Sequence, residues 1–243
     1  MASSPRLSRR ALFSGAAALA VASALPGDVW ATTLSPSATH ALLDADGGWT
    51  LLDADADGVA LYQKAVTGHG VFAYKGVRPI AVRPQTLFDT VCDVPAHKAI
   101  SGGVLAESVL LHSSESLMHY YQVMRSPAWV PISDRYWFLQ SSVRRDIGGR
   151  AGHHKRAWSP LDATKYAEAH KGVVSRFPDA VQVTINCGSW EVQPGKTAED
   201  SVLIYRIFSH PGGNISDSVA SQVSQRSLPE NMLKFEAAAK QRA

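Results

Sequence analysis

The clearest chemical pattern in this sequence is a run of alternating carboxylates, Asp53, Asp55 and Asp57, followed by Gly58. These spacings open the calcium-binding loop of an EF-hand, in which oxygen ligands alternate along the loop and a glycine allows a sharp turn. Such a loop also needs a bidentate glutamate near its end, and Lys64 stands at that position. We therefore interpret the run as a solvated acidic turn and predict no metal site.

Histidine, serine and glycine patterns give no catalytic or cofactor site. His153 and His154 are adjacent, so on a strand their side chains point to opposite faces. No other residue at metal-ligand spacing accompanies them. Gly195, Lys196 and Thr197 lack the upstream glycine of a phosphate loop, and the glycine-serine motif of hydrolases is missing. We predict no catalytic residue and no cofactor.

The two cysteines, Cys92 and Cys187, form no redox motif. In an oxidising compartment they could be joined in one disulfide. Alternatively, both are free thiols that pack as small apolar side chains. The sequence leaves both alternatives open, because a disulfide requires the two Cα atoms to lie within bridging distance.

The N-terminal segment has the layout of a secretory signal peptide. Arg9 and Arg10 precede an apolar run over residues 11–25, which is shorter than the ~20 residues of a membrane-spanning helix. The paired arginines are similar to a twin-arginine export motif, and an ordinary Sec leader is the alternative. Cleavage after Ala31 is favoured over cleavage after Ala24. The segment predicts an exported, periplasmic protein.

Composition indicates a chain that folds around a core, since 45% of its 243 residues are hydrophobic and 19% are charged. The formal charge of +3 falls to +1 when a leader ending at Ala31 takes away three arginines and one aspartate. A body so close to neutral has no broad basic surface for nucleic acid. We expect residues 1–31 to be a leader, residues 32–48 a flexible lead-in with a short helix at residues 37–43, and residues 49–243 one monomeric domain.

Most of that domain has the period-two pattern of strands. Residues 84–99 have helical spacing instead, and an amphipathic helix with Pro229 inside it ends the chain. We expect strands at residues 59–66, 72–82, 104–112, 117–124, 135–144, 151–158, 173–177, 181–192 and 202–209. This pattern predicts an α+β fold in which a curved antiparallel sheet is closed by the long C-terminal helix around a hydrophobic cavity.

Three parts of the sequence together resemble the START family, the steroidogenic acute regulatory-related lipid transfer domains. Residues 57–64 are similar to the family's opening strand, and residues 131–137 to its proline-serine-arginine entry into a central strand. Residues 210–215, with residues 226–229 further on, resemble the start and the proline of its closing helix. The order and spacing of these parts agree with the predicted strands and final helix. The resemblance implies the helix-grip fold and the binding of one lipid molecule between sheet and helix.

The cavity wall is expected at alternate strand positions, and the gate at an apolar loop that meets the last helix. Trp129 in that loop is suited to a transient contact with a membrane surface. Arg135 is, by the resemblance, a buried charge that orients a ligand or bonds to Asp134 or to backbone carbonyls. The predicted site residues are His119, Tyr121, Trp129, Val130, Ile132, Arg135, Trp137, Leu139, Val183, Ile185, Val219, Val223 and Met232.

The expected function is therefore the carriage of one hydrophobic lipid, such as a sterol-like molecule, a hopanoid or an acyl lipid, between membranes. Two alternatives stay open. A helix-grip enzyme of the cyclase type would need acid and base groups in the cavity, for which His119, Tyr120, Tyr121 and Arg135 form the only candidate cluster. A lipid sensor or partner-binding module would bind lipid without transferring it.

Overall fold

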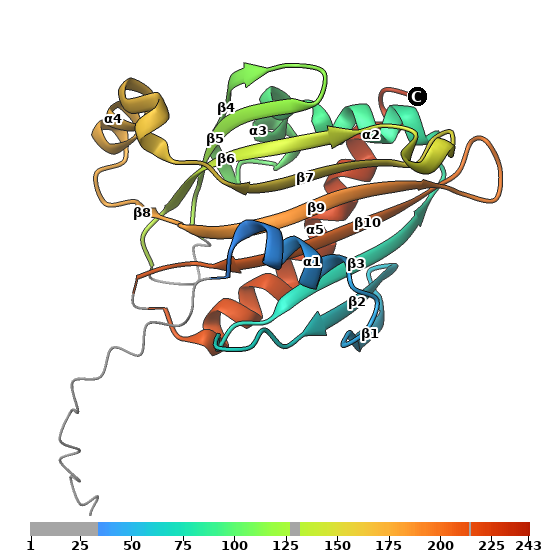
Figure 1. Ribbon diagram of the computed structural model, residues 1–243, viewed down its shortest axis with the longest axis horizontal. Helices are drawn as coiled ribbons and strands as arrows, with labels where there is room; N and C mark the ends of the chain where they lie inside the picture. Colours follow the sequence, from blue (N-terminus) through green and yellow to red (C-terminus); the bar gives the residue numbers. More distant parts are fainter. Residues whose placement is uncertain (1–33, 127–131, 214) are drawn as a thin grey trace, which may run out of the picture. The chain divides into compact units, whose positions relative to one another are not determined.

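The computed structural model describes residues 34–126, 132–213 and 215–243, and its main element is one strongly curved sheet (Figure 1). The sheet has ten strands, in the order β1-β2-β3-β10-β9-β7-β6-β5-β4, with the short β8 paired to β6. All neighbours are antiparallel except β8 and β6. The pairing of β3 with β10 joins the first strands of the domain to the last one.

The elements of the described residues run as follows. The strands are β1 (Thr50–Ala56), β2 (Val59–Lys64), β3 (Ala73–Ile80), β4 (Leu105–Ser113), β5 (Leu117–Met124), β6 (Arg135–Arg144), β7 (His154–Pro160), β8 (Val181–Gln182), β9 (Ile185–Pro194) and β10 (Ser201–His210). The helices are α1 (Pro36–Asp44), α2 (Pro84–Cys92), α3 (His97–Ile100), α4 (Ala167–Arg176) and α5 (Asp217–Lys240), with short 3-10 turns η1 (Val94–Ala96), η2 (Ile147–Gly149) and η3 (Ala163–Tyr166). The predicted α+β class and the long closing helix are confirmed.

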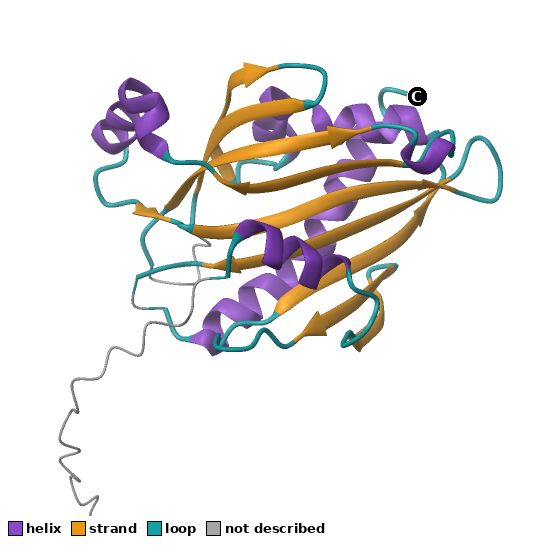
Figure 2. Ribbon diagram, viewed as in Figure 1, coloured by secondary structure: helices purple, strands orange, loops and turns teal. Residues whose placement is uncertain are grey.

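The two faces of the sheet carry different helices (Figure 2). We call the face that packs against α5 and α2 the inner face, and the face that packs against α1 the outer face. The largest hydrophobic cluster lies on the inner face and includes Phe88 of α2 and Phe235 of α5. A second cluster joins α4 to β4, β5 and β6, and a third joins α1 to β9 and β10. The inner face is the one that the long helix closes.

Helix α5 packs on the sheet through one apolar stripe. Its buried residues Leu228, Met232, Phe235 and Ala239 recur at the three- and four-residue spacing of a helix face. Ser216 caps the first turn by accepting a hydrogen bond from the Val219 amide. Within the described part of the chain, no helix is both long and apolar enough to cross a membrane.

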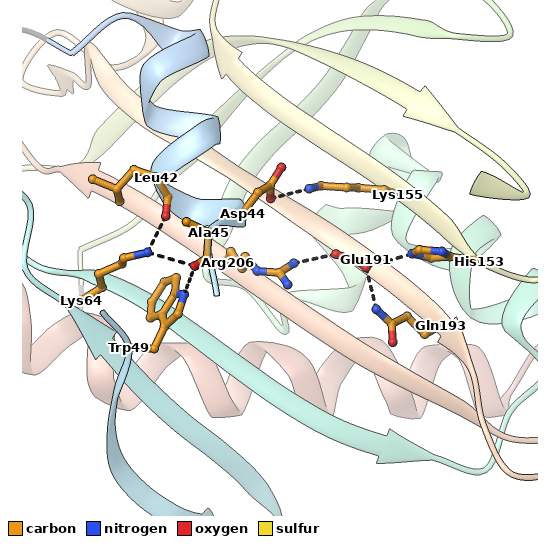
Figure 3. A network of polar contacts seen from close by, with 10 residues as sticks. All are labelled: Leu42, Asp44, Ala45, Trp49, Lys64, His153, Lys155, Glu191, Gln193 and Arg206. Carbon is orange, nitrogen blue, oxygen red and sulfur yellow. Dashed lines mark hydrogen bonds and ion pairs between the residues drawn. The ribbon is translucent and has the colours of Figure 1, made fainter. Parts of the chain in front are cut away.

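Helix α1 is held on the outer face by packing and by a polar network (Figure 3). Leu43 is fully buried against the sheet. Lys64 Nζ donates to the carbonyls of Leu42 (2.7 Å) and Ala45 (3.0 Å), where the exposed carbonyls of a helix end attract a cation. The short helix expected at residues 37–43 is confirmed by α1. Its residues are part of the folded unit, so the expected flexibility of residues 32–48 is wrong for them.

Two other predictions about elements are also wrong. Residues 173–177 were expected to form a strand, but they lie in and just after α4. Val173 alone is buried there. A segment of five residues is too short to distinguish the period of a strand from that of a helix. Conversely, the acidic run was not expected to be a strand, but most of it belongs to β1. Its carboxylates are exposed on an edge strand, where charge discourages pairing with other chains. Asp57 and Gly58, both with positive φ, turn the chain into β2.

Both cysteines are free thiols, which contradicts the disulfide alternative. Cys92 at the end of α2 packs against the inner-face cluster, whereas Cys187 of β9 lies in the cluster between the outer face and α1. The two side chains are therefore on opposite sides of the sheet. Burial raises the pKa of each thiol to about 11, so both stay protonated at neutral pH.

Gly188 of β9 allows the indole of Trp158 to lie directly on the strand. A Cβ at this position would come within 2.3 Å of the Trp158 ring and 2.5 Å of the Arg206 carbonyl, which is backbone and cannot move aside. We expect Gly188→Ala to lower the free energy of unfolding by about 1–3 kcal/mol, measured by chemical denaturation. Gly47→Ala is the control, because a Cβ at that position would have no other described residue within 4 Å apart from its chain neighbours. Equal effects of the two substitutions would contradict the close packing of Trp158.

The outer-face network predicts a pH dependence of stability. Glu191 accepts hydrogen bonds from His153 (2.9 Å), Gln193 (2.7 Å) and Arg206 (2.7 Å) (Figure 3). Burial by itself would raise the pKa of the Glu191 carboxyl, but these bonds and the charge of Arg206 lower it to about 2. A carboxyl whose pKa is lowered on folding stabilises the folded state above its unfolded pKa of about 4.3, and this contribution is lost as the pH falls toward 2.

We expect Glu191→Gln to cost about 1–3 kcal/mol at neutral pH and to reduce the further loss of stability between about pH 5 and pH 3. The measurement is the melting temperature across this range, with the exposed Glu199→Gln as the matched control. If the wild type and Glu191→Gln lose stability in parallel as the pH falls, the network does not stabilise the ionised carboxylate.

Candidate ligand-binding cavity

A cavity of about 290 Å³ lies between the inner face of the sheet and α5. Its volume is close to the lower end of the range for small-molecule sites, about 300–1,000 Å³. Strands β4, β5, β6, β7, β9 and β10 contribute to its wall, and α3 and α5 as far as Phe235 cover it. Its apolar lining includes Leu105, Met124, Ile132, Trp137, Leu139, Trp158, Val183, Trp190, Ile207, Ile215, Val219, Val223, Leu228 and Phe235.

Aromatic rings form one side of this wall. Trp190 and Tyr205 are directly opposed on β9 and β10 and stack with ring centroids 4.0 Å apart. Trp158 also stacks with Tyr205, with ring centroids 5.7 Å apart, and the ring of Phe235 of α5 lies 4.9 Å from that of Trp190. Directly opposed residues point to the same face of a sheet, so pairing fixes these rings toward α5. The arrangement gives a rigid apolar surface.

A chain of hydrogen bonds crosses the cavity wall beside Gln122. Its side-chain oxygen accepts from Trp137 Nε1 (3.1 Å), and its amide group lies 3.1 Å from His97 Nδ1 and donates to Ser108 Oγ (2.9 Å). His97 Nε2 is 3.1 Å from the carbonyl of Val91. This geometry fits a neutral imidazole with its proton on Nε2. Burial, then the positive charge of Arg156, lowers the pKa of His97 to about 3, so the ring is uncharged at neutral pH.

Arg156 of β7 brings a positive charge to the cavity. Its Nη1 donates to the Val91 carbonyl at 2.5 Å, its Nε donates to Ser141 Oγ at 3.2 Å, and the guanidinium lies 4.8 Å from the centre of the Tyr120 ring. The side chain is only 1% exposed. It is therefore a buried cation in a largely apolar site.

Arg135, in contrast to Arg156, has a structural role. Its guanidinium donates to the carbonyls of Pro211 (2.9 Å) and Gly212 (3.3 Å), and also to that of Ser133. These bonds tie the start of β6 to the segment that leads into α5. Of the two roles considered from the sequence, the geometry favours bonding to backbone carbonyls.

The structure brings together seven of the predicted site residues. Those around the cavity are Ile132, Arg135, Trp137, Leu139, Val183, Val219 and Val223. Trp129 and Val130 lie outside the described residues, so the predicted gate and its membrane contact stay predictions.

Four predicted residues lie elsewhere. His119 and Tyr121 point to the outer face, where His119 Nδ1 is 2.8 Å from the Tyr166 hydroxyl and Tyr121 donates to Glu107. The prediction that they line the cavity is wrong because their neighbours Tyr120 and Gln122 oppose Leu139 and Trp137 across the strand pair.

Ile185 and Met232 are also corrected. Ile185 packs in the outer-face cluster with α1, since even-numbered residues of β9 are the ones that face inward. Met232 is fully buried against β3, where a Cβ on Gly76 would come within 2.5 Å of its sulfur. It holds α5 on the sheet and does not line the cavity.

Sequence reasoning missed much of the inner wall. His97, Tyr120, Gln122, Arg156, Trp158, Asn186, Trp190 and Tyr205 all line the cavity. One signal was available for Arg156, which stands inside a strand between otherwise uncharged residues on its own face. Which alternate residues of β5 face inward depends on the register of β5 against β6. That register could not be predicted from the sequence of the loop that joins the two strands.

Comparison with solved structures defines the fold. A STAR-related lipid transfer protein fragment from Xanthomonas axonopodis superposes with a TM-score of 0.66 at 19% identity, covering 79% of this chain and 99% of that one. Human STARD10 gives 0.68 at 19% identity (84% and 77% covered), and human StAR-related lipid transfer protein 5 gives 0.65 at 14% identity (84% and 91% covered).

The chain has the helix-grip fold of STAR-related lipid transfer domains, as the sequence resemblance implied. One of these neighbours, the Xanthomonas fragment, is bacterial, and the present chain covers 99% of it. Comparison of the sequence with protein-family models and with curated proteins found no match.

Proposed function

We propose that this protein binds one hydrophobic lipid molecule in the cavity between the sheet and α5 and carries it between membranes. The observation that carries the proposal is the cavity itself, whose wall is formed by aromatic and aliphatic side chains. Transfer of an apolar ligand from water to such a wall is favourable by roughly 25 cal/mol per Å² buried. The few polar groups at the wall fix the orientation of the ligand.

The protein acts by binding and release, with no bond made or broken. The candidate acid and base cluster of a helix-grip enzyme is divided by the sheet, because Tyr120 faces the cavity while His119 and Tyr121 face α4 and η3. His97 in the wall is neutral and already bonded on both ring nitrogens. These positions favour a carrier over the cyclase-type alternative.

The proposed place of action is the periplasm, and the proposed state is a monomer. The N-terminal arginines and the apolar run that follows support export. A carrier there would contact a membrane surface only transiently, to load and release its lipid.

A vesicle assay tests the carrier function. Donor vesicles of phosphatidylcholine hold either dehydroergosterol or a pyrene-labelled fatty acid, and acceptor vesicles hold neither. We expect catalytic amounts of the protein to speed the equilibration of at least one probe. Binding of a probe without faster exchange would favour the sensor alternative. If the protein binds none of the probes and speeds the exchange of none of them, the proposal is contradicted.

A further inference from the structure

Arg156 differs from the other buried cations of this protein. Three lysine or arginine residues of the described chain are less than a tenth exposed, namely Arg135, Lys155 and Arg156. Lys155 forms an ion pair with Asp44 at 2.5 Å, and Arg135 donates to several backbone carbonyls. Arg156 is the most deeply buried of the three at 1% exposure, and unlike Lys155 it has no carboxylate partner among the described residues.

The polar contacts of Arg156 leave part of the guanidinium unsatisfied. One carbonyl and one hydroxyl accept from Nη1 and Nε, and the Tyr120 ring lies beside the cation. Nη2 has no hydrogen-bond partner, and no carboxylate is within ion-pair distance, among residues 34–126, 132–213 and 215–243. An arginine has five N–H donors and keeps its charge in proteins. A buried charge with no opposite charge beside it carries a desolvation cost that hydrogen bonds to neutral groups offset only in part.

The other groups around the cavity do not supply a negative charge near Arg156. His97 is neutral and its two nitrogens are occupied. Burial raises the pKa of the Tyr205 hydroxyl, so this group is also neutral. Glu230 lines the cavity from α5 but is exposed to solvent and forms no ion pair with Arg156 within the described residues. The other two cations of the lining, Arg135 and Lys234, donate to backbone carbonyls, and neither is as deeply buried as Arg156. Arg156 is therefore the buried cation of the lining that has no negative charge beside it among the described residues.

A single buried guanidinium is matched best by a single negative charge. A carboxylate has one charge and two oxygens that fit the planar fork of arginine. A phosphate monoester carries a charge of about −1.5 to −2 at neutral pH. One arginine neutralises only part of that charge, so the rest would stay uncompensated in an apolar site. A neutral head group such as a hydroxyl or an ester leaves the guanidinium uncompensated.

We propose that the natural ligand is a lipid monocarboxylate, an apolar body that ends in one carboxylate bound by Arg156. This inference rests on the proposed lipid-binding function and adds the chemical class of the ligand. The carboxylate enters first and accepts hydrogen bonds from the free N–H groups of Arg156. The apolar body then lies along the stacked rings of Trp158, Tyr205 and Trp190 under α5.

The first test needs no substitution. Binding of laurate, methyl laurate and dodecyl phosphate to the delipidated wild-type protein is measured by titration with detection of tryptophan fluorescence. We expect laurate to bind about tenfold or more tightly than methyl laurate, the range of a charge-assisted hydrogen bond. Equal affinity of the acid and its ester would overturn the inference while leaving lipid binding intact. Tighter binding of dodecyl phosphate would overturn the assignment of a carboxylate. Failure of all three to bind would count against both the inference and the proposed function.

The second test compares Arg156→Gln with Lys155→Gln. The two residues are adjacent on β7 and carry the same charge, but Lys155 points to the outer face and contacts Asp44. We expect Arg156→Gln to weaken laurate binding about tenfold and to leave methyl laurate within about twofold, and Lys155→Gln to change neither. A laurate preference that survives Arg156→Gln would overturn the assignment. If Arg156→Gln does not fold, the wild-type comparison of acid and ester decides.

Discussion

Replacement of Ser224 by tryptophan is expected to abolish lipid binding while leaving the protein folded. Ser224 lies on α5 and lines the cavity, and among the described residues its hydroxyl bonds to the carbonyl of Ala220 in the same helix. An indole at this position would occupy much of the volume of about 290 Å³ that a ligand needs. We expect at least about a tenfold loss of affinity for any lipid that the wild type binds, measured by titration.

Gln222→Trp is the matched control for this experiment. Gln222 is on the same helix two residues away but is exposed, so the same side chain there leaves the cavity unchanged. The two variants should unfold at similar temperatures and differ in lipid affinity. If Ser224→Trp binds lipid as well as Gln222→Trp does, the ligand does not occupy the cavity under α5.

Met232→Ala is expected to have the largest effect on stability. Met232 is fully buried where α5 crosses β3, and Gly76 lets the helix approach the strand closely. Removal of a buried side chain of this size leaves a cavity and costs about 2–5 kcal/mol. We expect this loss in the free energy of unfolding from denaturant titration, with the order of lipid preference unchanged.

Leu233→Ala is the comparison for Met232→Ala. Leu233 is the next residue on α5 and is only partly buried. We expect it to cost about 1 kcal/mol or less. A cost as large as that of Met232→Ala would show that the closing helix is held by a different face from the one described.

The fold was largely predictable from the sequence because strong patterns span most elements. The predicted limits of β5 and β6 match the structure, and the apolar spacing of the last helix matches its buried stripe. The errors occur where the pattern is short or misleading. Val173 lies in a five-residue segment that fits both the strand period and the helix period. The acidic residues of β1 resembled an ion-binding turn because this edge strand is exposed and lacks the apolar alternation of a strand with a buried face.

The site was less predictable because its geometry depends on register. Trp137 and Leu139 were placed on the cavity side together with His119 and Tyr121, whereas the pairing of β5 with β6 puts Gln122 and Tyr120 opposite them. A shift of one residue moves every side chain of a strand to the other face. Arg156 was not predicted as a site residue. The feature that makes it important is that no described carboxylate lies beside it, and this can be seen only in the coordinates.

Native mass spectrometry with lipid extraction tests the central claim most directly. The protein is purified from the cells that make it and examined without added ligand. The account predicts one lipid per chain, and the inference about Arg156 predicts that this lipid carries a carboxylate. A protein that arrives without lipid, and that takes up none of the sterols, hopanoids or acyl lipids offered to it, would contradict the claim that its cavity binds lipid.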